Sequence, residues 1–195
     1  MTAPVAAQSH DKGAGARRRL VEIVTEKSLL SGTEIKLTSG KDSTFYFDMK
    51  PTLFDPEAAG LIADLILGAL RDEPVDFIGG MEMGAVPIVA CVAERSFPDR
   101  PLEGFFVRKQ VKAHGTKRLI EGLPEGALSG RRVVLVEDVT TTGGSVLKAV
   151  EAARGEGAEV ATIVTVVDRL EGAEAGLARH DLRLLSLLTT ADFEI

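Results

Sequence analysis

Val133-Val134-Leu135-Val136-Glu137-Asp138-Val139-Thr140-Thr141-Thr142-Gly143-Gly144-Ser145 is the stretch that decides how this 195-residue chain folds. Its apolar start, rich in valine, is typical of a strand that is covered on both faces of a parallel sheet. Two acids follow, then a run of threonines and glycines, then an expected helix over residues 144–154. Because ligands of open α/β sheets bind at the carboxyl ends of strands, this loop is the first candidate site.

The residue types in this loop suit a phosphorylated sugar. Glycines let backbone N–H groups approach a phosphate, and the following helix offers its positively polarised N-terminus. Glu137 and Asp138 fit sugar hydroxyls, or a divalent cation that bridges to phosphates. The sequences G-x-x-x-x-G-K-[ST] and G-x-G-x-x-G, which mark the two common phosphate loops, do not match here. A tight connection without a ligand is the competing interpretation, and the joining of two acids to T-T-T-G-G disfavours it.

Composition limits the classes of protein that remain. Hydrophobic residues make up 45% of the chain, which is typical of a globular protein, and its length fits one domain. Apolar runs are too short to span a bilayer, and the N-terminal residues lack a signal-peptide pattern. The net charge of −6 disfavours nucleic-acid binding, and the single Cys91 excludes an intrachain disulfide. We therefore expect a cytoplasmic protein with no nucleic-acid and no membrane partner.

Hydrophobic periodicity predicts alternating helices and strands. Expected helices cover residues 17–30, 56–71, 84–94 and 144–154, with Asp55 capping the second and Pro56 at its first position. Expected strands cover residues 75–78, 104–107, 132–136, 160–167 and 182–188, with a hairpin over 35–47 and a loop over 114–121. This alternation predicts an α/β domain with a doubly wound, mostly parallel sheet. We expect a single domain over residues 1–195, with a mobile tail over 1–16 and a small N-terminal hood over about 17–50.

A compact basic segment stands out in this acidic chain: Arg108-Lys109-Gln110-Val111-Lys112-Ala113-His114-Gly115. Arginine grips phosphate through two parallel hydrogen bonds, and lysine acts as a mobile point charge. Gly115 and the polar residues after it suggest a loop that closes over a ligand and excludes water. Alone, the segment would be read as a solvated connection. Beside the acid–threonine–glycine loop, it predicts a grip on a small polyanion.

Three further segments are candidates for the same site. Gly79-Gly80-Met81-Glu82-Met83-Gly84 follows an expected strand, and its backbone N–H groups could cradle a second anion. Asp168-Arg169 ends another strand, where Arg169 could bind a carboxylate; an ordinary surface pair with Glu171 is the alternative. The stretch from Ser39 to Asp48 joins a turn to three aromatic residues, which either pack in the core or stack on a base-like ligand.

Five segments, in their order along the chain, resemble those of the orotate phosphoribosyltransferases, a family of type I phosphoribosyltransferases: K-L-T-S-G-K-D-S-T-F-Y-F-D, G-G-M-E-M-G-A-V-P-I, F-F-V-R-K-Q-V-K-A-H-G, V-V-L-V-E-D-V-T-T-T-G-G-S and V-V-D-R. The resemblance spans roughly Leu20 to the C-terminus. It implies the type I phosphoribosyltransferase fold with a small hood. It also implies transfer of ribose 5-phosphate from phosphoribosyl pyrophosphate (PRPP) to N1 of orotate, giving orotidine 5′-monophosphate and pyrophosphate in pyrimidine (UMP) biosynthesis.

The resemblance assigns roles to single residues, which we state as expectations. It implies Mg²⁺ held mainly by PRPP and water, with no direct protein ligand, and a homodimer whose basic loops reach a shared active site. Catalytic roles would fall to Lys112, His114, Glu137 and Asp138. PRPP would be bound by Arg108, Lys109, Lys112, His114, Glu137, Asp138, Val139, Thr140, Thr141, Thr142, Gly143, Gly144 and Ser145. Orotate would be bound by Thr141, Arg169, Tyr46 and Phe47.

Two positions depart from the family pattern. Some members carry lysines that touch PRPP where this chain has Thr38 and Met83, and Lys41 or Lys50 could compensate. Two alternatives also remain. A purine-type phosphoribosyltransferase would share the PRPP motif and differ in the hood, whereas a PRPP-sensing regulator would keep the ligand site and bind nucleic acid. The net charge of −6 and the basic loop count against the regulator.

Overall fold

The computed structural model describes residues 5–36, 42–110 and 118–195. A five-stranded sheet forms its centre, in the order β4-β3-β7-β8-β9. The strands are β4 (Glu103–Gly104), β3 (Phe77–Gly80), β7 (Arg132–Thr140), β8 (Glu159–Asp168) and β9 (Arg183–Thr189). Neighbouring strands in this sheet all pair in parallel, which confirms the predicted α/β class and parallel sheet.

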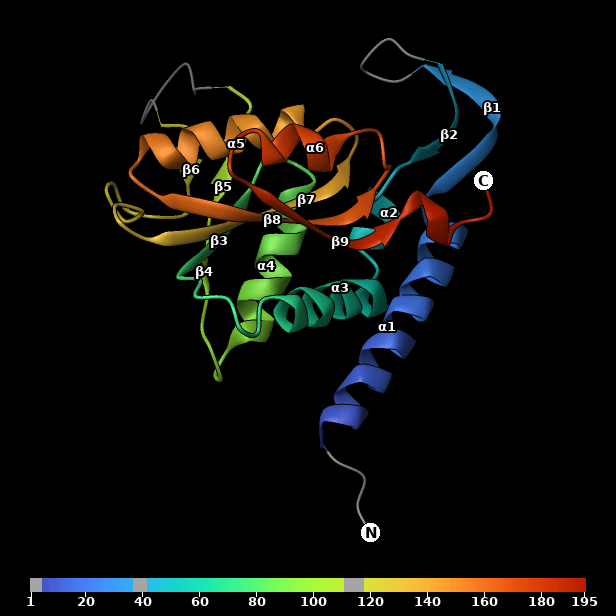
Figure 1. The fold of residues 1–195 in the computed structure, drawn as a ribbon, viewed down its shortest axis with the longest axis horizontal. Helices are drawn as coiled ribbons and strands as arrows, with labels where there is room; N and C mark the ends of the chain where they lie inside the picture. Colours follow the sequence, from blue (N-terminus) through green and yellow to red (C-terminus); the bar gives the residue numbers. More distant parts are fainter. Residues whose placement is uncertain (1–4, 37–41, 111–117) are drawn as a thin grey trace.

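Helices cover both faces of the sheet, so it is doubly wound as predicted (Figure 1). One face carries α5 (Gly144–Gly155) and α6 (Ala173–Ala178), and the other carries α3 (Pro56–Ala69) and α4 (Ala85–Ser96). Successive residues of a strand point to opposite faces. Val134 and Val136 accordingly join the apolar cluster on the α3–α4 side, and Val133 and Leu135 join the cluster on the α5 side. All four are buried, as the apolar run predicted.

The N-terminal hood consists of α1 (Val5–Lys27), the antiparallel hairpin of β1 (Leu29–Lys36) and β2 (Asp42–Phe47), and the short α2 (Lys50–Leu53). The predicted hairpin is confirmed, although β1 begins earlier than expected. The helix also begins at Val5 and not at residue 17, so residues 5–16 are helical where a tail was predicted. Proline is absent from positions 5–16, and alanine is a strong helix former, so the helix extends beyond its amphipathic part.

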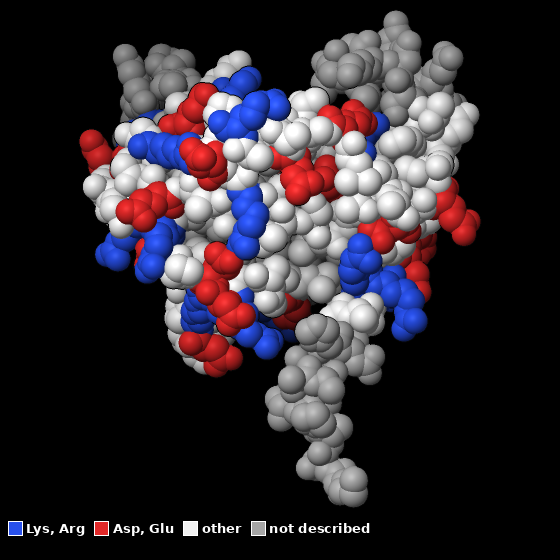
Figure 2. Space-filling model, viewed as in Figure 1, with Lys and Arg blue, Asp and Glu red and all other residues white. Residues whose placement is uncertain are grey.

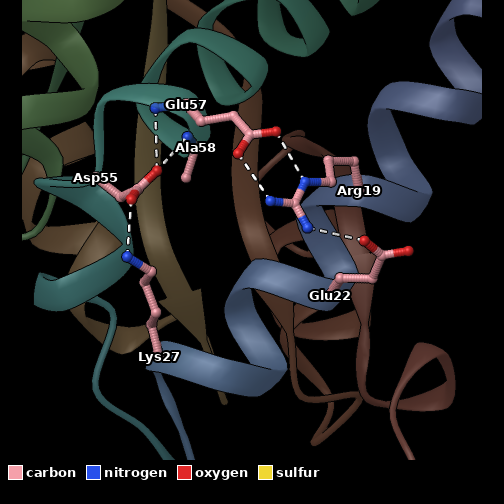
Figure 3. A network of polar contacts seen from close by, with 6 residues as sticks. All are labelled: Arg19, Glu22, Lys27, Asp55, Glu57 and Ala58. Carbon is pink, nitrogen blue, oxygen red and sulfur yellow. Dashed lines mark hydrogen bonds and ion pairs between the residues drawn. The ribbon is translucent and has the colours of Figure 1, made fainter.

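Ion pairs fasten α1 to α3 (Figure 3). The guanidinium of Arg19 binds Glu57 at 2.8 Å and Glu22 at 2.9 Å, and Lys27 Nζ lies 2.8 Å from Asp55 Oδ2. Asp55 also accepts hydrogen bonds from the N–H groups of Glu57 and Ala58, at 3.0 and 2.9 Å. The predicted helix cap at Asp55 is therefore confirmed, and the same carboxylate holds the hood against the body.

Several predicted boundaries are wrong. The expected strand over 104–107 is two strands, because Phe105 turns into the core between β4 and β5 (Phe106–Val107). β5 then pairs with β6 (Ile120–Glu121), inside a segment predicted as loop. β7 continues to residue 140, because its last residues pair with β8. The short elements α2, α6 and η1 (Thr190–Asp192) were not predicted, since they hold too few residues to show a periodicity.

The surface in the view of Figure 2 carries lysine and arginine interspersed with aspartate and glutamate. This mixture agrees with the modest net charge of −6. In the ranges that the structure describes, no helix has the length and apolar character needed to cross a membrane.

Candidate active site

The predicted acidic pair lies where β7 extends beyond the end of the neighbouring strand β3. The last paired residues of β3 and β7 are Gly80 and Val136, whereas β7 continues beside β8 as far as the pair Thr140 and Asp168. Glu137 and Asp138 therefore lie inside β7, whereas the sequence predicted that they follow the strand. They stand beyond the end of β3, next to the turn that follows it. Both acids thus lie toward the carboxyl edge of the sheet, where ligands of open α/β sheets bind.

Glu137 is a buried acid whose environment favours its neutral form. Its side chain is only 6% exposed, and its Oε2 atom has no hydrogen-bond partner among the described residues. Burial raises the pKa of the Glu137 carboxyl well above its ordinary value, and the charge of Asp138 raises it further, while a hydrogen bond with Ser145 acts in the opposite direction. A buried acceptor without a partner is unfavourable, so this atom suits a ligand that brings a donor.

Asp138 is held by its own backbone and by the turn after β3. Its Oδ1 atom accepts a hydrogen bond from the N–H of Val139 at 2.8 Å. Its carboxylate also packs on Gly84, where an added Cβ atom would stand 2.4 Å from Cγ. Only a residue without a side chain fits at that distance. The Asp138 carboxylate therefore has a defined position beside Glu137.

The loop after β7 leads into a helix whose N-terminus is uncapped by any side chain. Gly143 occupies the capping position with a φ of 83°, a conformation that favours glycine, and α5 has no acid in its first turn. Thr141 is partly buried, whereas Thr142 and Ser145 are exposed. The first N–H groups of a helix lack intrahelical partners and attract anions. This arrangement suits the predicted phosphate loop.

Thr140 differs from the prediction. Its side chain is 2% exposed, and its hydroxyl donates to Oδ1 of Asp168 at 3.2 Å. Asp168 is itself buried and accepts a second hydrogen bond from the N–H of Leu170 at 3.1 Å. The Thr140 side chain therefore joins the ends of β7 and β8 and does not face a ligand, because the strand extends one residue further than its apolar run.

The predicted glycine-rich segment, Gly79 to Gly84, begins inside β3 and continues into the turn after it. A Cβ atom at Gly79 would stand 2.3 Å from the ring of Phe105, and one at Gly80 would stand 2.4 Å from the carbonyl oxygen of Val136. Both glycines thus allow close packing inside the sheet, and the cradling of an anion by the backbone N–H groups of this segment stays a prediction. The turn proper starts at Met81, contains the cis peptide bond between Glu82 and Met83, and leads to α4.

Only the start of the basic segment belongs to the described residues. The N–H of Arg108 donates to the carbonyl of Leu119 at 2.8 Å, which joins β5 to the returning chain. Arg108 and Lys109 line a hollow of about 380 Å³, whose other lining residues are Met81, Val107, Leu119, Lys148, Glu151 and Ala152. Lys112 and His114, both predicted to contact pyrophosphate, lie outside the described residues, as do Thr38 and Lys41.

Arg169 follows β8 and meets the hood. Its side chain is buried, and its Nε atom lies 2.8 Å from Oε1 of Glu171. Its guanidinium carbon stands 4.4 Å from the ring centroid of Phe45. The predicted pair with Glu171 is therefore present, but it is not an ordinary surface pair, because the arginine is buried and also packs on an aromatic ring. A buried guanidinium at this edge is suited to hold a carboxylate.

Of the two predicted aromatic residues, the structure brings only Tyr46 to the surface. Tyr46 is 37% exposed, whereas Phe47 is 3% exposed and packs on Phe193 with ring centroids 5.0 Å apart. Phe47 is therefore a core residue and not an orotate-facing one. Phe45, which sequence reasoning missed, contacts Arg169. Alternation along β2 is the signal that would have separated Tyr46 from its two neighbours.

Lys50, at the start of α2, is paired with an acid of the hood. Its ammonium group pairs with Asp48. That hydrogen bond raises the pKa of Lys50, and the charges of Asp48, Tyr46 and Asp138 contribute in the same direction. Asp48 is thus the main partner of Lys50, and the charge of Asp138 makes a smaller contribution.

The residues present fit a hard cation only through a ligand. In the described part of the chain, no group of three or more histidine, cysteine, aspartate or glutamate side chains is arranged to hold a metal ion. Glu137 and Asp138 offer two carboxylates, one with the unpaired Oε2 atom. Two acids suit hydroxyl donors directly, and they suit Mg²⁺ when phosphates and water complete its octahedral shell.

The fold of this chain is that of the phosphoribosyltransferases. The family model described as phosphoribosyl transferase domain matches residues 52–186. An orotate phosphoribosyltransferase of Rhodopseudomonas palustris (strain BisB5) is 52% identical over 180 residues, covering 91% of this chain and 96% of the relative.

Solved structures agree with this. The orotate phosphoribosyltransferase of Mycobacterium tuberculosis in complex with Fe(III) dicitrate has a TM-score of 0.80 and 37% identity, and covers 92% of this chain and 99% of its own. The same enzyme in complex with PRPP has a TM-score of 0.74 and 34% identity, covering 91% and 98%. This chain belongs to the orotate phosphoribosyltransferase family.

Proposed function

We propose that the acidic pair on β7 and the open N-terminus of α5 together hold the ribose 5-phosphate of PRPP. At this site the chain, as an orotate phosphoribosyltransferase, transfers the ribose 5-phosphate group to N1 of orotate. The main observation in support is the buried Oε2 atom of Glu137, which lacks a hydrogen-bond partner among the described residues. It lies beside the carboxylate of Asp138, whose position is fixed by packing on Gly84. Ribose hydroxyls would supply the missing donors. The adjacent loop, residues 141–145, would wrap the 5-phosphate with its backbone N–H groups.

The reaction needs positioning and charge more than a protein base. Orotate N1 attacks C1 of the ribose as an already anionic nucleophile, while the bond from C1 to pyrophosphate breaks and positive charge develops at C1. Glu137 and Asp138 would hold the ribose, and the carboxylate of Asp138 would favour that charge. Arg108, Lys109, Lys112 and His114 would stabilise the departing pyrophosphate, and the chain would hold both reactants in line.

Orotate would bind between the hood and the end of β8. Arg169 is proposed to hold its carboxylate, with Thr141 from the phosphate loop and Tyr46 from the hood. Support comes from the burial of Arg169 and from the exposure of the Tyr46 ring at the same edge. A guanidinium with restricted motion recognises a planar carboxylate through two parallel hydrogen bonds.

Mg²⁺ is the proposed cofactor. It would be held mainly by PRPP and water, next to Glu137 and Asp138, and when bound it would neutralise charge on the pyrophosphate. Some family members carry a positively charged lysine where this chain has Met83. Lys50 is proposed to replace part of that charge. The charge of Asp138 contributes to the raised pKa of Lys50, which agrees with this role. An unchanged Michaelis constant for PRPP in Lys50→Ala would contradict it.

We also propose a cytoplasmic homodimer in which the basic segment of one protomer serves the other. The arrangement is the one that membership of the orotate phosphoribosyltransferase family suggests, and Arg108 and Lys109, at the start of the basic segment, line a hollow with Lys148 and Glu151 of α5. Lys112→Ala and Asp138→Asn remove one residue from each side of a shared site. Mixing the two inactive variants should therefore restore part of the activity, whereas sites built from one chain would stay inactive.

The direct test is the absorbance change on mixing the protein with Mg²⁺, PRPP and orotate. Turnover should require all three, and adenine, hypoxanthine and xanthine should not replace orotate. Turnover with a purine base and none with orotate would support the purine-type alternative. A gel shift with DNA and no turnover would support the regulator. Lys112→Ala and Asp138→Asn should each lower turnover by about 10²–10³-fold, and near-wild-type turnover in either would contradict its role.

A further inference from the structure

Glu82 contacts the basic segment through both its backbone and its side chain. Its N–H donates to the carbonyl of Val107 at 2.8 Å, and its Oε1 atom accepts a hydrogen bond from the N–H of Lys109, also at 2.8 Å. The preceding residue, Met81, forms a parallel bridge with Val107. The Glu82 carboxylate therefore accepts a hydrogen bond from the next part of the same chain segment, just beyond the point where the two backbones stop pairing. It connects positions 27 residues apart in the sequence.

The other end of the same turn reaches the acidic pair. Gly84, two residues after Glu82, packs on the carboxylate of Asp138. The turn between them is closed by hydrogen bonds from Ala85 N–H to Met81 O at 3.3 Å and from Val86 N–H to Met83 O at 3.2 Å. The turn thus contacts the ribose-holding acid at one end and the start of the basic segment at the other. A shift at either contact would move the two halves of the site relative to each other.

An acid at this position needs an explanation, because pyrophosphate is repelled by a carboxylate. The hydrogen bond supplies one. It uses the main-chain N–H of Lys109 and not its ammonium group, so it fixes the backbone without neutralising that positive charge. Charge-assisted bonds of this kind are stronger than bonds between neutral groups. The function of Glu82 would then lie in its acceptor oxygen, which an amide oxygen can also provide.

We propose that Glu82 is a positioning residue that fastens the base of the basic segment to the turn after β3 and so sets where Arg108 and Lys109 meet the pyrophosphate of PRPP. The inference rests on the proposed function, because it concerns the same site. It goes beyond that function by assigning a role to a residue outside the phosphate loop, the acidic pair and the basic segment.

Steady-state kinetics of three variants test the proposal: Glu82→Ala, Glu82→Gln and the control Glu94→Ala, which removes an exposed acid on α4. Losing one charge-assisted hydrogen bond should raise the Michaelis constant for PRPP about tenfold in Glu82→Ala. The Michaelis constant for orotate should stay within about twofold. Glu82→Gln should stay close to wild type, because it keeps the acceptor, and Glu94→Ala should match wild type.

Hydrogen exchange of the Lys109 amide provides a readout that needs no turnover. Exchange should be about tenfold faster in Glu82→Ala than in wild type, and near normal in Glu82→Gln. Normal exchange together with a normal constant for PRPP in Glu82→Ala would overturn the proposal. So would a Glu82→Gln variant as impaired as Glu82→Ala. If wild type showed no turnover with orotate, the proposed function would fail, while the exchange data would still test the contact.

Discussion

Gly84 and Asp138 are in direct van der Waals contact, so that a Cβ atom at Gly84 would stand 2.4 Å from Cγ and about as close to both carboxylate oxygens, at 2.6 and 2.5 Å. Real Cβ contacts are not that short, so any side chain at position 84 must displace the acid or the turn. Gly84 lies in the turn between β3 and α4, whereas Asp138 lies inside β7, so the two residues are distant in the sequence and adjacent in the structure. This contact makes the turn after β3 and the acidic end of β7 one structural unit.

Gly84→Ala should therefore lower turnover far more than it lowers stability. The added methyl displaces the Asp138 carboxylate, and a displacement of about 1 Å in a positioned group can reduce the rate about 10²-fold. Steady-state kinetics and thermal unfolding measured side by side check this. The matched control is Gly60→Ala in α3, where an added Cβ meets nothing within 4 Å. It should keep full activity and gain up to about 1 kcal/mol of stability. Equal activity in the two variants would contradict the prediction.

Asp138→Asn preserves the shape of the side chain and the acceptor for the N–H of Val139, and it removes the negative charge. If the charge favours the developing cation at C1, turnover should fall about 10²–10³-fold, with little change in the melting temperature. A loss of activity that merely follows a loss of folded protein would count against an electrostatic role.

Glu137→Gln should stabilise the protein while it abolishes most of the activity. Because the folded pKa of Glu137 is raised, the folded state binds more protons than the unfolded state above the ordinary glutamate pKa of about 4.3. Wild-type stability should accordingly decrease as pH rises from that value through the raised folded pKa, and the glutamine variant should lack this part of the decrease. Melting temperatures between pH 4 and 8 measure the effect, and parallel curves for the two proteins would refute it.

Arg169 should affect orotate more than PRPP. Arg169→Lys keeps the charge but loses the planar fork that matches a carboxylate. We expect the Michaelis constant for orotate to rise about tenfold or more, corresponding to one hydrogen bond to a charged group, while the constant for PRPP changes little. Arg179→Lys, at an exposed position after α6, is the control. An equal rise in both constants would indicate general damage to the site.

Asp55 can be tested as both cap and ion-pair partner. The pKa of Asp55 is lowered, first by its hydrogen bond from Lys27 and then by that from the N–H of Ala58. Its contribution to stability is thus present above the ordinary aspartate pKa of about 3.9 and is lost as pH falls through the lowered folded value. Asp55→Asn keeps the cap and Asp55→Ala removes it, so the alanine variant should melt lower. Identical melting curves for both variants at pH 7 would exclude a capping contribution.

Local sequence was sufficient for much of the fold. The apolar run from Val133 to Val136 predicted a strand buried on both faces, and Asp55 with Pro56 predicted a helix start, because these signals depend on neighbouring residues. The acid–threonine–glycine order likewise predicted the connection between a strand and a helix, here β7 and α5. Boundaries were less predictable. The end of β7 depends on pairing with β8, and the division around Phe105 depends on a ring that packs on Gly79.

By itself, the sequence determined the α/β class, the hairpin and the family to which the chain is similar, since each follows from the order and spacing of residues along the chain. Only the tertiary structure decided which side chains face the site. It buried Phe47 and Thr140, placed Phe45 on Arg169, and left one oxygen of Glu137 unpaired among the described residues. It also joined Glu82 to Lys109. These relationships arise from contacts between elements distant in the sequence, and no local pattern encodes them.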